Sequence, residues 1–153
     1  MLFRSVETIN VNVSGTMNLL ECARKWKVPH VIFASTSAVY ENNKEKLFTE
    51  DLEINPRLWY SLSKKMAEEV CESYRINYNM PITTLRFFNV FGPRQDIHRK
   101  HPPLINYIVR EISNNNSPML HSDGEQKRDY IHVDDVRSEE HTSELQSQFR
   151  ISY

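Results

Sequence analysis

Helical patterns and short apolar runs alternate along this sequence, and the alternation restricts the fold more than any other feature does. Residues 12–27 have a helical pattern and are followed by the apolar run 31–34, and residues 58–78 have a second helical pattern followed by the strand-like run 82–88. An order of helix, strand, helix and strand is typical of right-handed crossovers in a parallel sheet. The sequence therefore predicts an α/β fold built on a doubly wound parallel sheet.

The spacing of apolar residues predicts which faces of these elements are buried. The first helix has apolar residues at three- and four-residue steps, and the second has one every four residues. The run 31–34 is too short for a helix and suits a strand that is covered on both faces. The residues expected to be buried are Val13, Met17, Leu20 and Ala23, widened by Leu19, Cys22 and Trp26, in the first helix, and Leu62, Met66, Val70 and Tyr74 in the second.

The rest of the chain predicts a loop, a third helix and a short strand. Residues 89–103 contain Gly-Pro and Pro-Pro pairs, which indicate a loop. Residues 104–112 have the apolar spacing of a helix, and residues 130–133 suit a strand. Residues 137–153 lack apolar periodicity and resemble the translation of a sequencing-library adapter. We expect this segment to be a non-native tail and leave it out of the fold prediction.

Composition excludes several classes of protein. The chain has 19 Lys and Arg against 20 Asp and Glu, a net charge of −1, which argues against binding to nucleic acid or to an anionic membrane. No apolar run approaches the roughly 18 residues of a membrane span, and the first residues lack the features of a signal peptide. The two cysteines have no metal-ligand spacing, so no metal site is predicted. We expect a cytoplasmic protein.

Two groups of residues could carry chemistry. Tyr60 and Lys64 lie four residues apart in the second helix and therefore share a face. A lysine ammonium beside a phenol lowers the phenol pKa and makes it a better general base. The alternative for this pair, a half-buried aromatic with a solvated lysine, stays open on spacing alone. Residues 35–37, Ser-Thr-Ser, follow the first strand, where parallel sheets bind ligands, although they could also be a plain polar strand end.

Five ordered motifs together resemble the NAD-dependent nucleotide-sugar epimerase/dehydratase family, a branch of the extended short-chain dehydrogenase/reductases. The resemblance covers about residues 6–136 and implies a Rossmann-like fold, NAD as cofactor, a nucleotide sugar as substrate and a homodimer when the protein is full length. The motifs are NVSGT at 12–16, STSAVY at 35–40, Tyr60-x-x-x-Lys64, LRFFNVFGPRQ at 85–95 and DGxxxRDYIHV at 123–133.

The resemblance also implies a role for each matching residue. Tyr60 would take a proton from a sugar hydroxyl, Lys64 would lower the pKa of Tyr60, and Thr36 would hydrogen-bond the same sugar oxygen. These three residues would be catalytic and would contact NAD. Thr36 and Tyr60 would also contact the substrate. The further cofactor contacts implied are Asn12 and Phe88, and the further substrate contacts are Asn89, Leu104 and Arg128.

The residue two positions after Thr36 bears on which reaction is catalysed. Relatives that eliminate water carry an acidic pair after the threonine, whereas this chain has Ser37 and Ala38, and Ala38 cannot transfer a proton. The resemblance therefore favours inversion at carbon 4 of a UDP-hexose by transient oxidation, as in the UDP-glucose 4-epimerases. A dehydratase or reductase of the same superfamily and a non-catalytic relative that binds NAD or a nucleotide sugar remain the alternatives. The chain departs from the family pattern at Glu41 and Ser122, both in turns.

Parts of the family pattern lie outside this sequence. The glycine-rich strand–turn–helix that meets the pyrophosphate of NAD is not found before Asn12, and most of the substrate-binding C-terminal region is not found after Val136. Residues 1–136 therefore correspond to the central and catalytic part of the family domain. We expect these 153 residues alone neither to bind NAD tightly nor to turn over.

Overall fold

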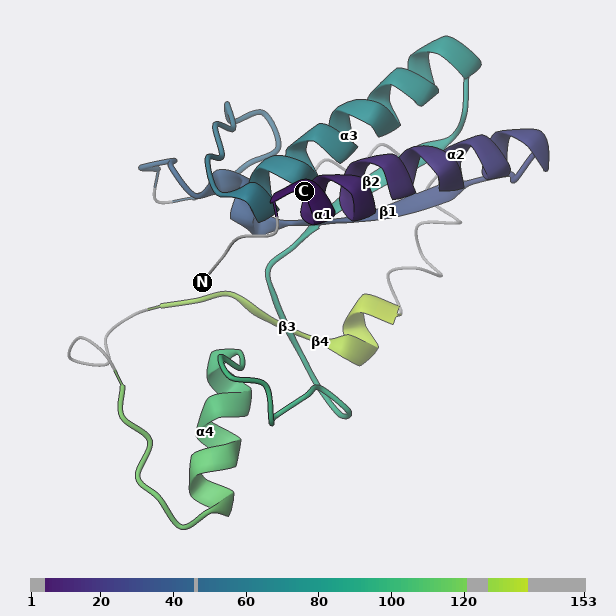
Figure 1. The fold of residues 1–153 in the computed structure, drawn as a ribbon. Coiled ribbons are helices and arrows are strands. Elements are labelled where there is room, and N and C mark those ends of the chain that lie inside the picture. Colours follow the sequence, from purple (N-terminus) through teal and green to yellow (C-terminus); the bar gives the residue numbers. More distant parts are fainter. Residues whose placement is uncertain (1–4, 46, 121–126, 138–153) are drawn as a thin grey trace. The chain divides into compact units, whose positions relative to one another are not determined.

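The computed structural model describes residues 5–45, 47–120 and 127–137 (Figure 1). The expected tail at 137–153 therefore lies almost wholly outside the described residues, as does the departure at Ser122. The described residues form two compact units, one ending at Phe87 and one beginning at Phe88, and each is described by itself. Within the described ranges, no helix has both the length and the apolar character needed to cross a membrane.

One continuous helical segment opens the first unit. It consists of α1 (Ser5–Ile9), a π-helical turn (Asn10–Ser14) and α2 (Gly15–Lys25). The predicted helix is therefore confirmed but begins before residue 12, and the amide of Gly15 bonds to the carbonyl of Asn10, five residues back. The spacing of apolar residues in the sequence does not predict a wider helical turn of this kind.

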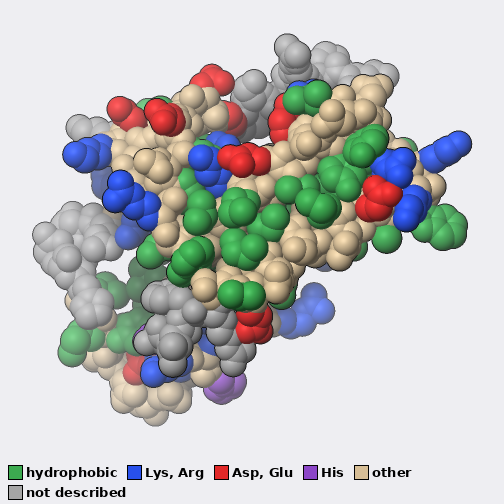
Figure 2. All heavy atoms as spheres, turned by 45° about the horizontal axis from the view of Figure 1, so that its top comes forward, with side chains coloured by type: hydrophobic (Ala, Val, Ile, Leu, Met, Phe, Trp, Pro, Cys, Tyr) green, Lys and Arg blue, Asp and Glu red, His purple; other side chains and the backbone are tan. Residues whose placement is uncertain are grey.

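The expected buried face of the first helix is too wide. Only Leu20 is buried in α2, whereas Leu19 and Trp26 are 73% and 83% exposed and Cys22 is exposed as well. These side chains project from other sides of the helix than the one that contacts the core. Figure 2 shows hydrophobic side chains gathered on the outer face of the helices.

Helix α3 (Trp59–Tyr78) confirms the second predicted helix to within one residue, but its buried stripe differs from the prediction. The four apolar residues expected to be buried are only partly so. Three of the four buried side chains are small ones on a neighbouring stripe, and α3 packs against the π-helical turn and the strands. They are Ser63, Ala67 and Cys71. The fourth, Ser61, lies on another face and donates to Glu41 at 2.9 Å.

The core of the first unit lies where α2, α3 and the strands meet. Leu20, Cys71 and Met80 form its buried centre. Partly buried side chains from both helices and both strands pack around them, namely Ala23, Val31, Phe33, Val70, Tyr74 and Ile82. Burial raises the pKa of the Cys71 thiol to about 11, which keeps it protonated and unreactive, as expected of a packing residue.

Strands β1 (Val31–Thr36) and β2 (Ile82–Phe87) pair in parallel, with Val31 opposite Ile82 and Thr36 opposite Phe87. The parallel α/β prediction is confirmed. The expectation that β1 is covered on both faces is wrong for the described residues, because only Ser35 in the two strands is buried. Helix α3 packs against both strands.

The second unit contains β3 (Asn89–Phe91), α4 (Leu104–Ser113) and β4 (Tyr130–His132). Helix α4 and strand β4 confirm the predictions, whereas the predicted loop at 89–103 is wrong for its first three residues, which pair in parallel with β4. Gly92 follows β3 with a φ of +155°, and a Cβ there would lie 2.5 Å from Cγ1 of Val133. Only glycine therefore fits where these two chain segments meet.

Candidate active site

Helix α3 carries the predicted general base near its start. Tyr60 is 52% exposed, so its hydroxyl is accessible to a ligand. Lys64, one turn later, is partly buried, and its Nζ donates to the carbonyl oxygen of Ala34 in β1 at 2.9 Å and lies 5.0 Å from the ring centroid of Phe33. Burial lowers the pKa of Lys64. The contact with Ala34 places the ammonium near the carboxyl end of β1.

Thr36 ends β1 and begins a short 3-10 turn, Ser37–Tyr40. Its Oγ1 accepts a hydrogen bond from the amide of Ala38 at 3.2 Å, and a hydroxyl that accepts one bond can still donate its own hydrogen. The neighbouring Ser35 is buried and donates to the carboxylate of Glu68. The Ser35 hydroxyl is thus taken up by a hydrogen bond within the protein, whereas the Thr36 hydroxyl lies at the turn.

Asn12 reaches the same part of the first unit from the π-helical turn. Its Nδ2 donates to Oγ of Ser63 at 2.9 Å, and that hydroxyl donates to the carbonyl of Tyr60 at 2.7 Å. A chain of two hydrogen bonds therefore joins Asn12 to the backbone of Tyr60. Ser63, which is fully buried, was not predicted to take part. In the sequence, only the position of Ser63 directly before Lys64 indicates that this serine could take part in the site.

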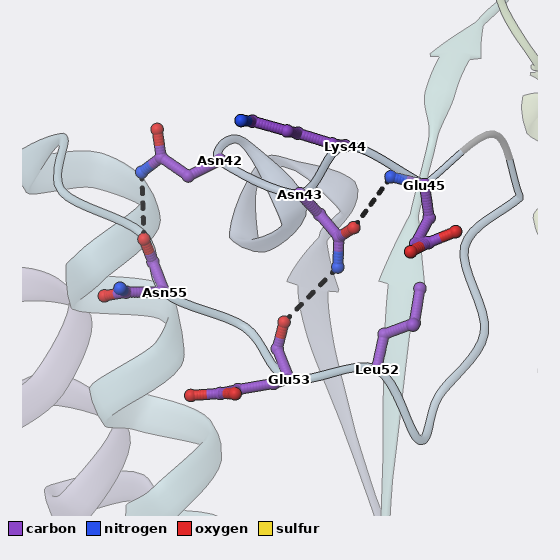
Figure 3. Close-up of a pocket in the computed structure, with 7 residues that line it drawn as sticks. All are labelled: Asn42, Asn43, Lys44, Glu45, Leu52, Glu53 and Asn55. Atoms are coloured by element: carbon purple, nitrogen blue, oxygen red, sulfur yellow. Dashed lines mark hydrogen bonds between the residues drawn. The ribbon is translucent and has the colours of Figure 1, made fainter.

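A hollow lies in the loop between the 3-10 turn and α3 (Figure 3). The predicted site residues are not among those that line it. Two of its lining side chains tie the loop together, since Asn42 donates to the carbonyl of Asn55 at 2.9 Å and Asn43 to that of Glu53 at 3.4 Å. The full lining is Asn42, Asn43, Lys44, Glu45, Leu52, Glu53 and Asn55.

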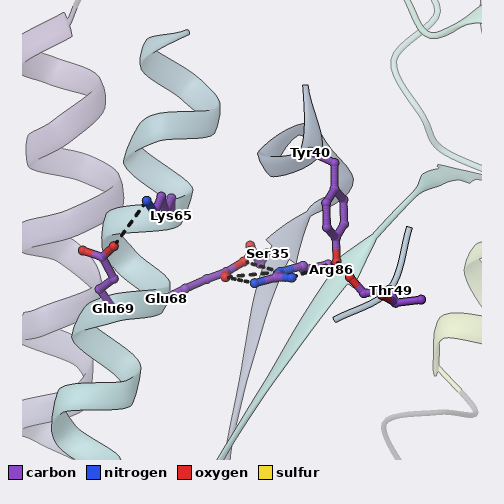
Figure 4. Close-up of polar contacts among 7 residues, drawn as sticks. All are labelled: Ser35, Tyr40, Thr49, Lys65, Glu68, Glu69 and Arg86. Atoms are coloured by element: carbon purple, nitrogen blue, oxygen red, sulfur yellow. Dashed lines mark hydrogen bonds and ion pairs between the residues drawn. The ribbon is translucent and has the colours of Figure 1, made fainter. Parts of the chain in front are cut away.

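An ion-pair network centres on Arg86 of β2 (Figure 4). Arg86 of β2 donates from Nη2 to Glu68 of α3 at 2.8 Å and from Nη1 to the hydroxyl of Tyr40 at 2.8 Å. Tyr40 in turn donates to the carbonyl of Thr49 at 3.1 Å. The hydrogen bond to Glu68 raises the pKa of Arg86 above its ordinary value. The network ties α3, β2 and the 3-10 turn together, and no pattern in the sequence indicates the part that Glu68 plays in it.

The remaining predicted residues belong to the second unit. Asn89 begins β3, and its Nδ2 donates to the carbonyl of Asp129 at 2.9 Å, so Asn89 lies beside the chain segment that carries Arg128. Phe88 directly precedes Asn89 and is partly buried, whereas Arg128 is exposed. Leu104 begins α4 and is 43% exposed. Three of these four residues therefore converge on one end of the β3–β4 pair.

The polar groups of the first unit suit the ribose and nicotinamide end of NAD. Lys64 has three N–H donors and uses one on Ala34, which leaves donors for ribose hydroxyls. The accessible hydroxyl of Tyr60 can both donate and accept, and Asn12, whose amide nitrogen is used on Ser63, keeps an amide oxygen. Across the described ranges, no group of three or more His, Cys, Asp or Glu side chains could hold a metal ion.

Known proteins resemble this chain over most of its length. The model of the NAD dependent epimerase/dehydratase family matches residues 3–138. A putative UDP-glucose 4-epimerase of Methanocaldococcus jannaschii is 37% identical over 128 residues, which cover 83% of this chain and 42% of that protein.

Two solved structures are also similar. A UDP-N-acetylglucosamine 4-epimerase from Methanobrevibacter ruminantium, in complex with UDP-N-acetylmuramic acid, is 33% identical with a TM-score of 0.81, covering 84% of this chain and 42% of that one. A double mutant of a dTDP-glucose 4,6-dehydratase from Streptomyces venezuelae, solved with NAD, is 30% identical with a TM-score of 0.71, covering 84% and 38%. The chain thus spans less than half the length of the relatives it matches.

Proposed function

We infer the function from the premise that this chain belongs to the NAD-dependent epimerase/dehydratase family. We propose that residues 1–136 are the catalytic middle part of a longer protein, hereafter the full-length protein, and that this protein inverts carbon 4 of a UDP-hexose with bound NAD. The observation that carries the proposal is that an accessible Tyr60 and a partly buried Lys64 lie one turn apart on one helix, which packs beside the Thr36 turn. The similar proteins include 4-epimerases.

The chemistry derives from these side chains. NAD, when bound, would supply the acceptor and later the donor of the hydride at carbon 4. Oη of Tyr60 would take the proton of the sugar hydroxyl, with Lys64 one turn later on the same helix. Thr36 donates a hydrogen bond to the same oxygen. Lys64 and Asn12 would hold NAD in the first unit, and within the second unit Asn89, Leu104 and Arg128 would hold the nucleotide and its phosphates.

The residues after Thr36 favour epimerisation over elimination. Ala38 has only a methyl group to offer at the position where an eliminating relative carries an acid. The next carboxylate along the chain is Glu41, and it accepts hydrogen bonds from the start of α3 instead of pointing to the Thr36 hydroxyl. Nucleotide-sugar dehydratases nevertheless occur among the similar structures, so a dehydratase is the second candidate.

Incubating the full-length protein with UDP-glucose in D₂O distinguishes the two reactions. We expect UDP-galactose to form with the original hydrogen retained at carbon 4, because the hydride leaves and returns within one active site. An elimination passes through loss of the carbon 5 proton, so it would yield a 4-keto-6-deoxy sugar carrying solvent deuterium. Proton NMR reports both products. Formation of the keto sugar, or no reaction with any UDP-hexose, would contradict the proposal.

We also propose that the full-length protein is a cytoplasmic homodimer. Large apolar side chains remain exposed on the helical segment and on α3, including Val6 at 72%, Leu19 at 73% and Ile76 at 66%. Figure 2 shows hydrophobic side chains gathered on the helices, and a second copy of the chain would cover them. The free thiols of Cys22 and Cys71 suit a reducing compartment. We expect sedimentation equilibrium to show that the full-length protein is a dimer and that its Leu19→Glu variant is a monomer. If the unmodified protein is a monomer, the dimer is ruled out.

A further inference from the structure

Glu41 reaches from the loop after the 3-10 turn to the start of α3. Its Oε1 accepts hydrogen bonds from the backbone amides of Arg57 and of Leu58, the latter at 2.8 Å, and its Oε2 accepts one from the hydroxyl of Ser61 at 2.9 Å. Glu41 is separated from these three residues by 16 to 20 positions in the sequence. One carboxylate thus binds three donors at the beginning of the helix that carries Tyr60.

The start of α3 has no cap of its own. Leu58 is the N-cap residue and has no side chain that can accept a hydrogen bond. In many helices a glutamate in the first turn reaches back to the N-cap amide, but here that position is Ser61, whose side chain is shorter. Glu41 supplies the missing carboxylate from a distant part of the chain. A negative charge there also suits the partial positive charge of the helix N-terminus.

The hydrogen bonds to Glu41 are strong enough to shift its titration. Burial by itself would raise the pKa of this carboxyl, but the hydrogen bonds from the amides of Leu58 and Arg57 and from the hydroxyl of Ser61 outweigh burial and hold the pKa below its ordinary value. Glu41 is therefore a carboxylate at neutral pH, and hydrogen bonds to a charged acceptor are stronger than those to a neutral one.

Glu41 also belongs to the turn that starts at Thr36. The 3-10 turn begins at Thr36, and Glu41 closes it by donating its amide to the carbonyl of Ala38 at 3.2 Å. The next two residues, Asn42 and Asn43, donate hydrogen bonds to the loop that returns to α3 (Figure 3). The backbone of Glu41 is thus fixed to the Thr36 turn, while its side chain is fixed to the first turn of α3.

We propose that Glu41 is a positioning residue that sets the place of Tyr60 relative to Thr36. Two residues lie between the N-cap Leu58 and Ser61 on α3, and Tyr60 is one of them, so a shift of the first turn moves the phenol directly. The inference rests on the proposed roles of Tyr60 and Thr36, since both must meet one sugar oxygen. The departure from the family pattern at Glu41 then adds hydrogen bonds that join the Thr36 turn to the start of α3.

Kinetics of variants of the full-length protein test this role. We expect Glu41→Ala to lower kcat by about 10- to 100-fold, because small misplacements of a reacting group have effects of that size, while KM changes little. Glu41→Gln keeps an oxygen acceptor for the two amides and should recover most of kcat. Glu53→Ala is the matched control, because Glu53 is an exposed carboxylate in the same loop and, in the part of the chain that the structure describes, bonds through its backbone carbonyl. It should leave both constants unchanged.

Hydrogen exchange of the same variants separates this inference from the proposed function. Glu41→Ala should speed exchange of the amides at 57–62 and leave the rest of α3 unchanged, whether or not the protein is an epimerase. If the unmodified full-length protein is inactive on UDP-hexoses, the proposed function is refuted. Hydrogen exchange alone then tests whether Glu41 holds the start of α3. Unchanged exchange at 57–62, or an unchanged kcat in an active Glu41→Ala protein, would overturn the inference. If Glu41→Ala does not fold, Glu41→Asp, one methylene shorter, replaces it.

Discussion

The Tyr60→Phe substitution should lower kcat of the full-length protein by about 10²- to 10⁴-fold, the range found when a general acid or base is removed. The change deletes one hydroxyl and keeps the ring and the backbone carbonyl that accepts from Ser63. The fold of α3 should therefore change little, and Lys64 and Asn12 remain to hold NAD. Initial rates of UDP-glucose conversion, with NAD content measured on the purified protein, check both parts of this expectation.

Tyr78 provides a matched control on the same helix. Its side chain is 53% exposed against 52% for Tyr60, and Phe at either position removes one hydroxyl. Tyr78 lies in the last turn of α3, far along the helix from Lys64. We expect Tyr78→Phe to keep the natural rate. Near-normal turnover by Tyr60→Phe would show that the phenol is not the base.

The second large effect concerns stability, at the ion pair of Arg86 and Glu68. Their side chains are only 20% and 11% exposed, and the pair is joined by several hydrogen bonds. Replacing Glu68 with alanine leaves a partly buried guanidinium without its carboxylate, and the cost should approach the about 3–5 kcal/mol found when one partner of a fully buried pair is removed. Urea unfolding of the full-length protein, followed by circular dichroism, should show a loss of that size.

Glu69→Ala is the control for this experiment. Glu69 is the neighbouring residue on α3 and pairs with Lys65 at 3.8 Å, but its side chain is 67% exposed (Figure 4). Exposed pairs contribute at most about 1 kcal/mol because water and salt screen them. If the two variants lost equal stability, the buried network around Arg86 would not have the importance that its geometry indicates.

The regular elements could be predicted from the sequence because each has a strong local signal. Helix α3 begins within one residue of its predicted start, and β1, β2 and β4 coincide with apolar or β-branched runs. Strand β3 was missed because Asn89–Phe91 is short and lies beside Gly92-Pro93, and its pairing depends on β4, about 40 residues away. Local patterns carry no information about such a partner.

The contacts of the candidate site could be predicted from the sequence only in part, and for a related reason. Tyr60, Lys64 and Thr36 have recognisable spacing, and the structure puts them in one unit. Ser63 and Glu68 act through contacts with Asn12, Ser35 and Arg86 that no spacing reveals. The buried stripe of α3 was wrong because burial depends on how closely helices approach, and small side chains allow the closest approach.

The π-helical turn between α1 and α2 makes chain length there as important as residue identity. The bond from the Gly15 amide to the Asn10 carbonyl spans one more residue than a regular turn does, and with this wider turn α1 and α2 both contact α3 and Asn12 reaches Ser63. Each residue of a regular α-helix advances the side-chain direction by about 100°, so an extra residue that no wider turn takes up rotates one part of the helix against the other. A single insertion in α1 or α2 should therefore disturb the contacts with α3 more than a deletion within Asn10–Ser14, which would restore regular winding.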